Sequence, residues 1–376
     1  MLNNRQNNYF DKIYIGTGPI LIFDAINEKL KGKNILMIDS KSKIGGAWKL
    51  IDLYGLNDLE NAVHYLIPNE VGYNFLEENL KIKLSRNEKK FYALKFFSHP
   101  IILSSSSIFG RLFSSFKNQL SADKISIFRL FMNIFRKTSY SNSKYPSKGC
   151  RVLLEKMENL IGIVNLNIKL NTLVEDIEII DLDYSKINTS KGDFYFKKLV
   201  LSHGFLPPKN INIYGEKISL EKKTHRRPSL HIVYSSKNEL LKRRTMSFSQ
   251  VLFDNESNIK YVHDLTQYIN KSSSQRNMYA LVLALKHHMK DCSETYQLVR
   301  KELEEFNLIP KSQYLNKVLY YWQDIVLPVL YTDDLKYLEK KSCGNIEIML
   351  TEELNSGFGM YSERWIFLKE LLGRIY

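Results

Sequence analysis

The sequence is informative first through what it lacks. Its 376 residues include only three cysteines, Cys150, Cys292 and Cys343, which lie far apart with no CxxC spacing. An odd number of widely spaced cysteines argues against a disulfide framework and against a zinc site. No apolar run reaches the ~20 residues of a membrane-spanning helix, and the polar first residues lack the apolar core of a secretory signal. We therefore expect a cytoplasmic protein that binds no metal.

Negative charge is scarce in one long segment. The chain carries 54 Lys and Arg residues against 40 Asp and Glu residues, a formal net charge of +14. Residues 81–150 hold fourteen Lys or Arg residues but only two acidic residues, Glu88 and Asp123. Such a cluster attracts anions, nucleic acid or anionic lipid, although it fits a solvated basic surface just as well.

Alternating apolar and glycine-containing segments near the N-terminus predict a nucleotide-binding βαβ unit. An apolar strand over residues 13–15 runs into a glycine turn, and a helix-compatible stretch follows over residues 23–30. A second apolar strand, residues 35–38, then ends on Asp39. This order holds the ADP half of a dinucleotide in folds of this kind.

The turn Gly16-Thr17-Gly18-Pro19 suits a pyrophosphate. Gly16 and Gly18 allow backbone N–H groups to approach phosphates that a Cβ atom would push away. Pro19 suits the first helical turn, where its missing N–H would have no helical partner. Leu21 stands where a third glycine is usual, so we expect the helix to lie farther from the strand or to start at a shifted position.

The second strand leads into further candidate cofactor contacts. Asp39, with Ser40 beside it, is placed to accept hydrogen bonds from ribose hydroxyls, or else to cap the strand end. A second glycine pair, Gly45-Gly46, follows six residues past Asp39 and is not part of a plain NAD fingerprint. Trp48 follows, and it either covers the cofactor or closes the core.

With this glycine doublet, the sequence resembles FAD-dependent oxidoreductases of the amine oxidase, phytoene desaturase and UDP-galactopyranose mutase superfamily. The resemblance is specific over residues 10–50 and suggestive over residues 145–204 and 345–372. It is absent over residues 205–330, which should hold the substrate chemistry. The resemblance implies FAD as the cofactor and a small-molecule substrate.

The resemblance also implies roles for three residues outside the first unit. Gly204 ends a strand that lies near the adenosine in the family, and Glu352 lies where the family reaches the ribityl chain. Thr351 replaces the glycine that usually precedes this acid. His64 is similar in position to a histidine that lies against the flavin in the sugar-mutase branch, and it is the candidate catalytic residue. The alternative for His64 is an ordinary polar niche.

The expected fold is α/β, with a Rossmann-like FAD-binding domain built from discontinuous segments. Residues 1–72, 146–204 and 331–376 should form that domain. Residues 73–145 should form an inserted helical cap, rich in basic and aromatic residues, and residues 205–330 a mixed α+β substrate domain.

Local patterns give more detailed expectations for these segments. Phenylalanines at helix-compatible spacings predict helices over residues 73–148. Short strands over residues 167–196 predict an antiparallel meander. Helices are also expected around residues 276–290 and 293–306.

The basic and aromatic stretch has three interpretations. It can form a cap over the active site, or residues 81–148 can make peripheral contact with an anionic membrane surface. Nucleic-acid binding is the least favoured, because no RNP-like run is present. The basic run 222–227 can bind an anionic substrate, or it can be an exposed loop.

The resemblance implies hydride transfer to flavin from a small organic or lipid-like substrate, which can be anionic. Two alternatives remain. One is a redox-neutral sugar mutase reaction, and the other is a non-catalytic scaffold that binds a lipid or protein partner, as Rab escort and GDP-dissociation-inhibitor relatives do. Leu21 and Thr351 favour the scaffold, whereas Asp39 and the Gly45-Gly46 doublet oppose it.

Overall fold

The computed structural model describes most of the chain. The described residues are 8–61, 70–86, 90–96, 99–104, 107, 144–202, 208–220, 224–236, 248–254, 256–268, 277–328, 332–349, 358 and 361–376. Among them, no helix combines the length and the apolar character needed to cross a bilayer.

The first half of the fold is a mixed sheet built around five parallel strands. Its strands are β1 (Tyr9–Ile15), β2 (Ile35–Ile38), β9 (Asn167–Lys169), β10 (Val174–Ile179), β11 (Ser185–Thr189), β12 (Gly192–Ser202), β13 (Asn210–Ile213), β14 (Glu216–Ile218) and β20 (Ile346–Met349). The order is β14-β13-β10-β11-β12-β1-β2-β9, with β20 also paired to β12. Strands β9, β2, β1, β12 and β20 run parallel to their neighbours in this group, and this is the arrangement that the βαβ pattern predicts.

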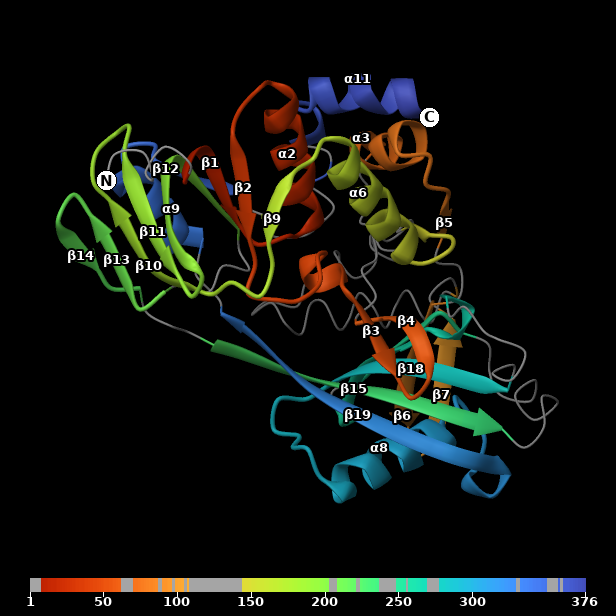
Figure 1. Cartoon of the computed structure of the whole chain (residues 1–376). Helices are drawn as coiled ribbons and strands as arrows, with labels where there is room; N and C mark the ends of the chain where they lie inside the picture. The colour runs from red at the N-terminus through yellow and green to blue at the C-terminus, as the bar shows by residue number, and fades with distance from the viewer. Residues whose placement is uncertain are drawn as a thin grey trace, which may run out of the picture.

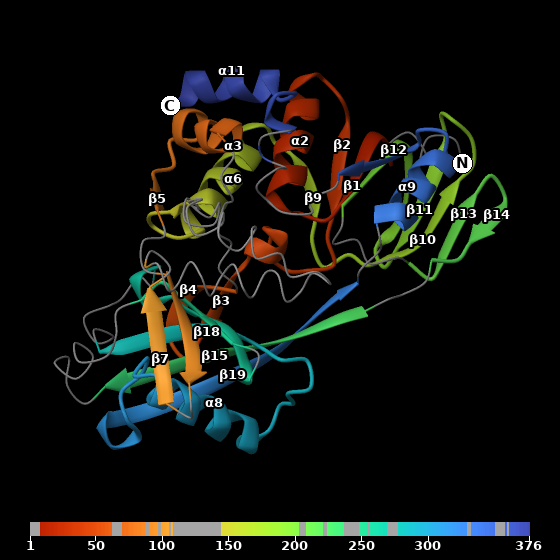
Figure 2. The ribbon, with the colours of Figure 1, turned by 180° about the vertical axis from the view of Figure 1, so that it is seen from behind.

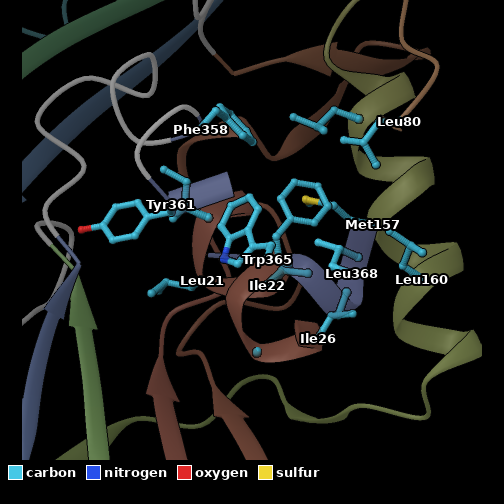
Figure 3. Packing of buried hydrophobic residues seen from close by; sticks show 14 of the residues in the cluster. Leu21, Ile22, Ile26, Leu80, Met157, Leu160, Phe358, Tyr361, Trp365 and Leu368 are labelled. Carbon is cyan, nitrogen blue, oxygen red and sulfur yellow. The ribbon is translucent and has the colours of Figure 1, made fainter. Parts of the chain in front are cut away.

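Helices cover this sheet on both sides (Figure 1). They are α2 (Pro19–Leu30), α3 (Glu70–Asn74) with the π-helical turn η2 (Phe75–Asn79), α6 (Arg151–Ile163), α9 (Thr332–Lys341) and α11 (Ile366–Ile375). Helix α2 contacts both α6 and α11. Figure 3 shows the core that they enclose, where Trp365 lies among side chains from all three helices. Segments from both ends of the chain therefore complete one hydrophobic core.

Helix α2 starts directly after the glycine turn, earlier than the expected helix body at residue 23. Gly18 is its N-cap residue and Pro19 its first helical residue. Leu21 is buried in the core between α2 and the sheet. The helix begins at Pro19, directly after the glycine turn, and the Leu21 side chain packs in the core.

The second half of the fold is a seven-stranded sheet. Its strands are β6 (Lys90–Phe96), β7 (His99–Ser104), β15 (Thr224–Ser236), β16 (Gln250–Phe253), β17 (Ile259–Asp264), β18 (Met278–Leu285) and β19 (Leu315–Pro328), in the order β19-β15-β18-β17-β16-β6-β7. Short helical turns η4 (Thr266–Tyr268) and η6 (Ser312–Tyr314) flank it, and α8 (Ser293–Glu305) packs on one face.

A small hairpin joins the two halves. Its strands, β3 (Leu50–Leu53) and β4 (Leu56–Glu60), follow the 3-10 turn η1 (Gly46–Trp48), and it packs on the face of the second sheet opposite α8. Figures 1 and 2 show it between the two sheets from opposite sides. Strands β5 (Leu84–Arg86) and β8 (Lys144–Pro146) pair with each other nearby. The segment after the glycine doublet thus leads directly to the contact between the hairpin and the second sheet, which we call the junction.

Three predicted elements are wrong. The described residues of 84–104 form strands rather than helices, because β6 pairs in parallel with β16 and β7 pairs with β6. Residues 278–285 form the interior strand β18 and not a helix; the prediction failed because periodicity cannot distinguish a short apolar run that is buried on both faces from a helix. Strand β9 does not join the meander but pairs in parallel with β2.

The chain passes from the first sheet to the second later than residue 205, where the sequence pattern placed the start of the substrate domain. Strands β13 and β14 still belong to the first sheet, through Ile218. The chain then crosses on β15 and returns on β19, and these strands pair from Thr224 with Pro328 to Ser236 with Leu315. The second sheet also takes in the hairpin β6–β7, which the sequence pattern assigned to the cap.

Candidate active site

The glycine turn leaves the start of α2 open. Gly16 has φ +104°, and its N–H donates to the carbonyl of Ile38 at 2.7 Å. A Cβ on Gly16 would lie 3.4 Å from Leu21 Cδ1, whereas a Cβ on Gly18 would have no described heavy atom within 4 Å. No side chain caps the helix at Gly18. Leu21 therefore fills the side of Gly16 and leaves the side of Gly18 accessible to a phosphate.

The glycine doublet lies against this turn. The N–H of Gly45 donates to the carbonyl of Thr17 at 2.9 Å. A Cβ on Gly46 would lie 3.2 Å from the Cα of Gly18, and one on Gly45 would lie 2.6 Å from Leu154 Cδ2. Both glycines have positive φ, +106° and +58°. The structure thus brings together the two predicted glycine pairs, and a Cβ on either glycine of the doublet would crowd a neighbouring residue.

Asp39 holds the turn in place. Its Oδ2 accepts hydrogen bonds from the N–H of Thr17 at 2.9 Å and from the Thr17 hydroxyl at 2.6 Å, and its Oδ1 accepts from the N–H of Lys41 at 2.9 Å. Ser40 beside it is exposed. Each carboxylate oxygen can accept two hydrogen bonds, so Oδ1 keeps capacity for one further donor. The ribose contact predicted for Asp39 and Ser40 stays a prediction.

Two lysines lie beside Asp39. Burial lowers the pKa of Lys49, and the positive charge of Lys41 lowers it further, while Asp39 raises it. Two cations are therefore held close together next to the glycine turn, where a bound anion would relieve their repulsion. The sequence pattern did not single out either lysine, because they become neighbours only when the turn folds.

Trp48 ends the 3-10 turn that follows the doublet. Its side chain is 1% exposed and belongs to the core around α2, and its carbonyl accepts a hydrogen bond from the Cys150 thiol at 3.6 Å. Trp48 therefore lies in the core, and its predicted contact with the cofactor stays a prediction.

The other predicted site residues lie outside the described residues. These are His64, Gly204 and Glu352. The same holds for residues 108–143 of the basic stretch and for the side chains of the basic run 222–227. Their predicted roles stay predictions.

A second cluster of buried polar groups lies where the hairpin meets α6. The Glu60 side chain is enclosed; its Oε2 accepts a hydrogen bond from the hydroxyl of Tyr145, and its Oε1 accepts one from the N–H of Cys150 at 2.8 Å. Burial raises the pKa of Glu60 to about 7, although these hydrogen bonds act in the opposite direction. A Cβ on Gly149 would lie 2.5 Å from Glu60 Oε1 and 3.2 Å from Tyr268 Cβ. Only glycine fits at this meeting point.

The second sheet contributes a histidine to the same place. His231 lies in β15 and is 1% exposed, and its Nε2 lies 3.3 Å from the carbonyl oxygen of Glu60. Burial lowers the pKa of His231 to about 4. The imidazole is therefore neutral near physiological pH.

These groups are connected to the cradle that the glycine turn and the glycine doublet form. Cys150, whose N–H binds Glu60, is the N-cap residue of α6. One turn later the same helix presents Leu154, the residue that a Cβ on Gly45 would meet. One helix thus fixes both the glycine doublet and the buried carboxyl. The sequence pattern did not single out Glu60 or His231, because neither stands in a motif and they become neighbours only when the hairpin packs on the second sheet.

No family model matches the chain, and no curated protein sequence matches it. Solved structures do match. Putrescine oxidase bound to putrescine aligns with a TM-score of 0.65, at 12% identity over 98% of this chain and 99% of that chain. This chain has an amine oxidase-like fold. Cyclohexylamine oxidase from Brevibacterium oxydans aligns with a TM-score of 0.61, at 10% identity over 97% of this chain and 99% of that chain.

The amine oxidase-like fold is also shared by a protein of a different kind. The Rab GDI from Plasmodium falciparum aligns with a TM-score of 0.53, at 14% identity over 96% of this chain and 98% of that chain. The α/β fold class predicted from the glycine pattern is confirmed, and so is the resemblance to the amine oxidase superfamily at the level of fold. Function is a separate question, because one fold supports many functions.

Proposed function

We propose that the chain is an FAD-dependent oxidoreductase that takes hydride from a small organic or lipid-like substrate. The observation that carries the proposal is the close approach of Gly46 to Gly18 beside an uncapped helix start. Two glycine pairs from separate segments expose backbone on both sides of one open position, as binding of a pyrophosphate requires. The amine oxidase-like fold supports the choice of FAD over a nicotinamide cofactor.

The residues of the cradle have distinct tasks in this proposal. The N–H groups at the start of α2 bind the pyrophosphate, and Asp39 holds Thr17 so that the turn keeps its shape. Lys41 and Lys49 add positive charge beside it. When bound, FAD supplies the hydride-accepting chemistry. The second sheet and the hairpin β3–β4 exclude water from the junction, where His231 and Glu60 are almost fully enclosed.

An anionic substrate and a membrane contact extend the proposal. Their support is the positive charge of residues 81–148 and of the run 222–227. Flotation with vesicles that contain anionic lipid should detect salt-sensitive binding if the basic stretch contacts membranes. Binding that is absent, or that is unaffected by salt, would leave the cap interpretation.

A non-catalytic scaffold is the second candidate. The fold of the Rab GDI from Plasmodium falciparum favours it, as does Leu21 in the place of the third glycine. Leu21 weakens the FAD proposal less than the sequence suggests, because its side chain is directed at Gly16 and not at Gly18.

The visible absorbance of oxidised flavin in the purified protein tests the choice. We expect FAD to be released on denaturation and identified by its mass. Gly46→Val should lose the flavin, because its side chain would collide with Gly18. Gly215→Val is the matched control, since Gly215 also has positive φ (+81°) but has no described atom within 4 Å of a Cβ.

Retention of flavin by Gly46→Val at the wild-type level would contradict the proposal. So would a wild-type protein that binds no FAD after reconstitution, which would favour the scaffold. If FAD is bound, substrate oxidation with reduction of the flavin separates the oxidoreductase from a redox-neutral mutase.

A further inference from the structure

A continuous series of hydrogen bonds runs from the Glu60 carboxyl to the glycine turn. Oε1 of Glu60 accepts from the N–H of Cys150 at 2.8 Å, and the Cys150 thiol donates to the carbonyl of Trp48 at 3.6 Å. The N–H of Trp48 donates to the carbonyl of Gly45, and the N–H of Gly45 donates to the carbonyl of Thr17, both at 2.9 Å. Each residue of the series therefore holds the next one in place.

Helix α6 makes a second connection between Cys150 and the doublet. The carbonyl of Cys150 accepts a hydrogen bond from the N–H of Leu154 at 3.2 Å, in the first turn of the helix. The Leu154 side chain occupies the place that a Cβ on Gly45 would need. Figures 1 and 2 show the start of α6 on the side of the hairpin β3–β4. A shift of this helix start would therefore move the doublet through its packing as well as through the thiol.

The series is enclosed by protein. Glu60, Cys150 and Trp48 are all buried. Burial raises the pKa of the Cys150 thiol, so the thiol keeps its proton and can donate it to the carbonyl of Trp48. Because water does not compete for these donors and acceptors, the hydrogen bonds are stronger than exposed ones. A change at one end of the series is then transmitted rather than absorbed by solvent.

Glu60 is the member of the series whose charge changes near neutral pH. Burial raises its pKa to about 7. The ionised carboxylate accepts from Tyr145 and Cys150 in charge-assisted hydrogen bonds, which are roughly twice as strong as neutral ones. In the protonated acid, one oxygen carries a proton and both bonds are neutral. Ionisation of Glu60 should therefore hold the start of α6 more firmly.

The groups around the Glu60 side chain stay uncharged over the same pH range. They are Tyr145 of β8, Cys150 of α6, Tyr268 of η4 and His231 of β15. Burial raises the pKa of both tyrosines and of the thiol, and it lowers the pKa of His231 to about 4. The cation that follows Cys150 on α6, Arg151, pairs with Asp58 and Glu155. An effect of pH on this cluster near neutrality is thus assigned to Glu60.

We propose that Glu60 and Cys150 are positioning residues of the cradle, and that ionisation of Glu60 strengthens the binding of a diphosphate-containing cofactor there. This inference deepens the proposed function, on which it rests, by adding control of cofactor affinity by a proton. Glu60 acts through Cys150 and the doublet and need not touch the cofactor. Because such coupling is reciprocal, binding of the cofactor favours loss of the Glu60 proton.

Three substitutions test the series at two of its members. Glu60→Gln keeps an acceptor for the N–H of Cys150 but is neutral at every pH. Cys150→Ala keeps the N–H and removes the thiol donor, whereas Cys150→Ser supplies a hydroxyl donor in its place. Cys292→Ala is the matched control, because Cys292 is also the N-cap residue of a helix and its thiol lies 3.3 Å from the Thr295 hydroxyl.

Hydrogen exchange in the full-length protein measures how firmly the doublet is held. Mass spectrometry of a peptide that covers residues 44–49 reports the N–H groups of Gly45 and Trp48, which exchange when their hydrogen bonds open. At about pH 8, Glu60→Gln should exchange severalfold faster than the wild type, and at about pH 5 the two should exchange alike, because Glu60 is then protonated. Cys150→Ala should also exchange faster, Cys150→Ser should restore slow exchange, and Cys292→Ala should match the wild type.

Titration of FAD into the flavin-free full-length protein, followed by flavin fluorescence, measures the effect on the cofactor. The dissociation constant of the wild type should fall about tenfold between about pH 5 and about pH 8, and that of Glu60→Gln should stay constant. The two phosphates of FAD are diesters whose charge does not change over this range, so the change belongs to the protein.

The two measurements separate the inference from the proposed function. Equal exchange in Glu60→Gln and wild type at about pH 8, or wild-type exchange in Cys150→Ala, would overturn the inference. The same pH dependence of FAD affinity in Glu60→Gln and wild type would also overturn it. A wild type that binds no FAD at either pH, but shows the expected exchange, would contradict the proposed function alone, because the exchange measurement needs no cofactor.

Discussion

The hydroxyl of Tyr145 donates a hydrogen bond to the buried carboxyl of Glu60, which links the strand before α6 to the end of the hairpin β3–β4. The two residues lie 85 positions apart in the chain, and Glu60 also accepts from the N–H of Cys150, 90 positions away. A titratable group is thus placed at the contact between separate segments. Stability should therefore depend on pH in a specific way.

Glu60→Gln should remove a stability loss that the wild type shows as the pH rises. Burial raises the folded-state pKa of Glu60 to about 7, whereas an exposed glutamate titrates near about 4.3. Between these values the folded protein binds more protons than the unfolded chain, so its free energy of unfolding falls with increasing pH, by about 4 kcal/mol in all. Urea denaturation at about pH 5 and about pH 8 measures this fall. A variant whose stability falls as steeply as that of the wild type would contradict the role of Glu60.

Tyr145→Phe should destabilise the protein more at high pH than at low pH. The ionised carboxylate of Glu60 needs the Tyr145 hydroxyl more than the protonated acid does, so we expect a loss of about 1–3 kcal/mol near pH 8. Tyr9→Phe is the control, since the Tyr9 hydroxyl donates to the Asp183 carbonyl at an exposed position. Denaturation curves of both variants at two pH values provide the measurement. An equal loss of stability for Tyr145→Phe at the two pH values would show that its effect does not depend on the ionisation of Glu60.

Gly45→Ala should destabilise the protein, and Leu154→Ala should partly compensate. A Cβ on Gly45 would lie 2.6 Å from Leu154 Cδ2, and the backbone has φ +106°. Overpacking and strain together should cost about 2–4 kcal/mol. Leu154→Ala removes the colliding methyl group, so a double-mutant cycle should show favourable coupling of about 1 kcal/mol or more. If the two losses of stability simply add in the double variant, the contact between residue 45 and Leu154 is not the cause of the destabilisation by Gly45→Ala.

Glu28→Gln should lower the free energy of unfolding at neutral pH. It should also make that free energy depend less steeply on pH in the acid range. Although burial raises its pKa, hydrogen bonds from Lys31 and Lys33 and the charge of Lys12 bring the pKa of Glu28 down to about 2. The resulting stability is fully present above the unfolded-state value of about 4.3 and is lost as the pH falls toward 2. We expect a loss of about 2–3 kcal/mol at neutral pH.

Glu77→Gln is the matched control for that prediction. Glu77 pairs with Lys144 at 2.9 Å, but both side chains are partly exposed. Such a pair is worth about 0–1 kcal/mol. Denaturation at neutral pH and at about pH 3 should separate the two variants, and equal effects would contradict the assignment of the lowered pKa to Glu28.

The glycine turn and the strands beside it could be predicted from sequence because their signals are local. The glycine turn, Pro19 at the helix start and the strand that ends on Asp39 lie within one stretch, and each agrees with the next. Strands β6 and β18 were missed because their pairing partners are distant and a short apolar run fits a helix as well as a strand.

The buried junction could not be found in this way. Glu60 and His231 are 171 positions apart, and neither belongs to a motif. Glu60 ends the mostly polar strand β4 and His231 lies within β15, and only the packing of the hairpin on the second sheet makes them neighbours. Leu21 was visible in the sequence, but its consequence for the glycine turn was not. That consequence depends on whether the side chain turns toward Gly16 or toward Gly18.

The pairing of Thr224 with Pro328 means that the chain leaves the first sheet and comes back at the same place. Residues 224–328 form an insert whose first strand, β15, pairs with its last strand, β19. Such an insert can vary during evolution while the chain enters and leaves it at one place, provided that β16 still pairs with β6. Variation of the second sheet on a constant first sheet is the outcome that this connection favours.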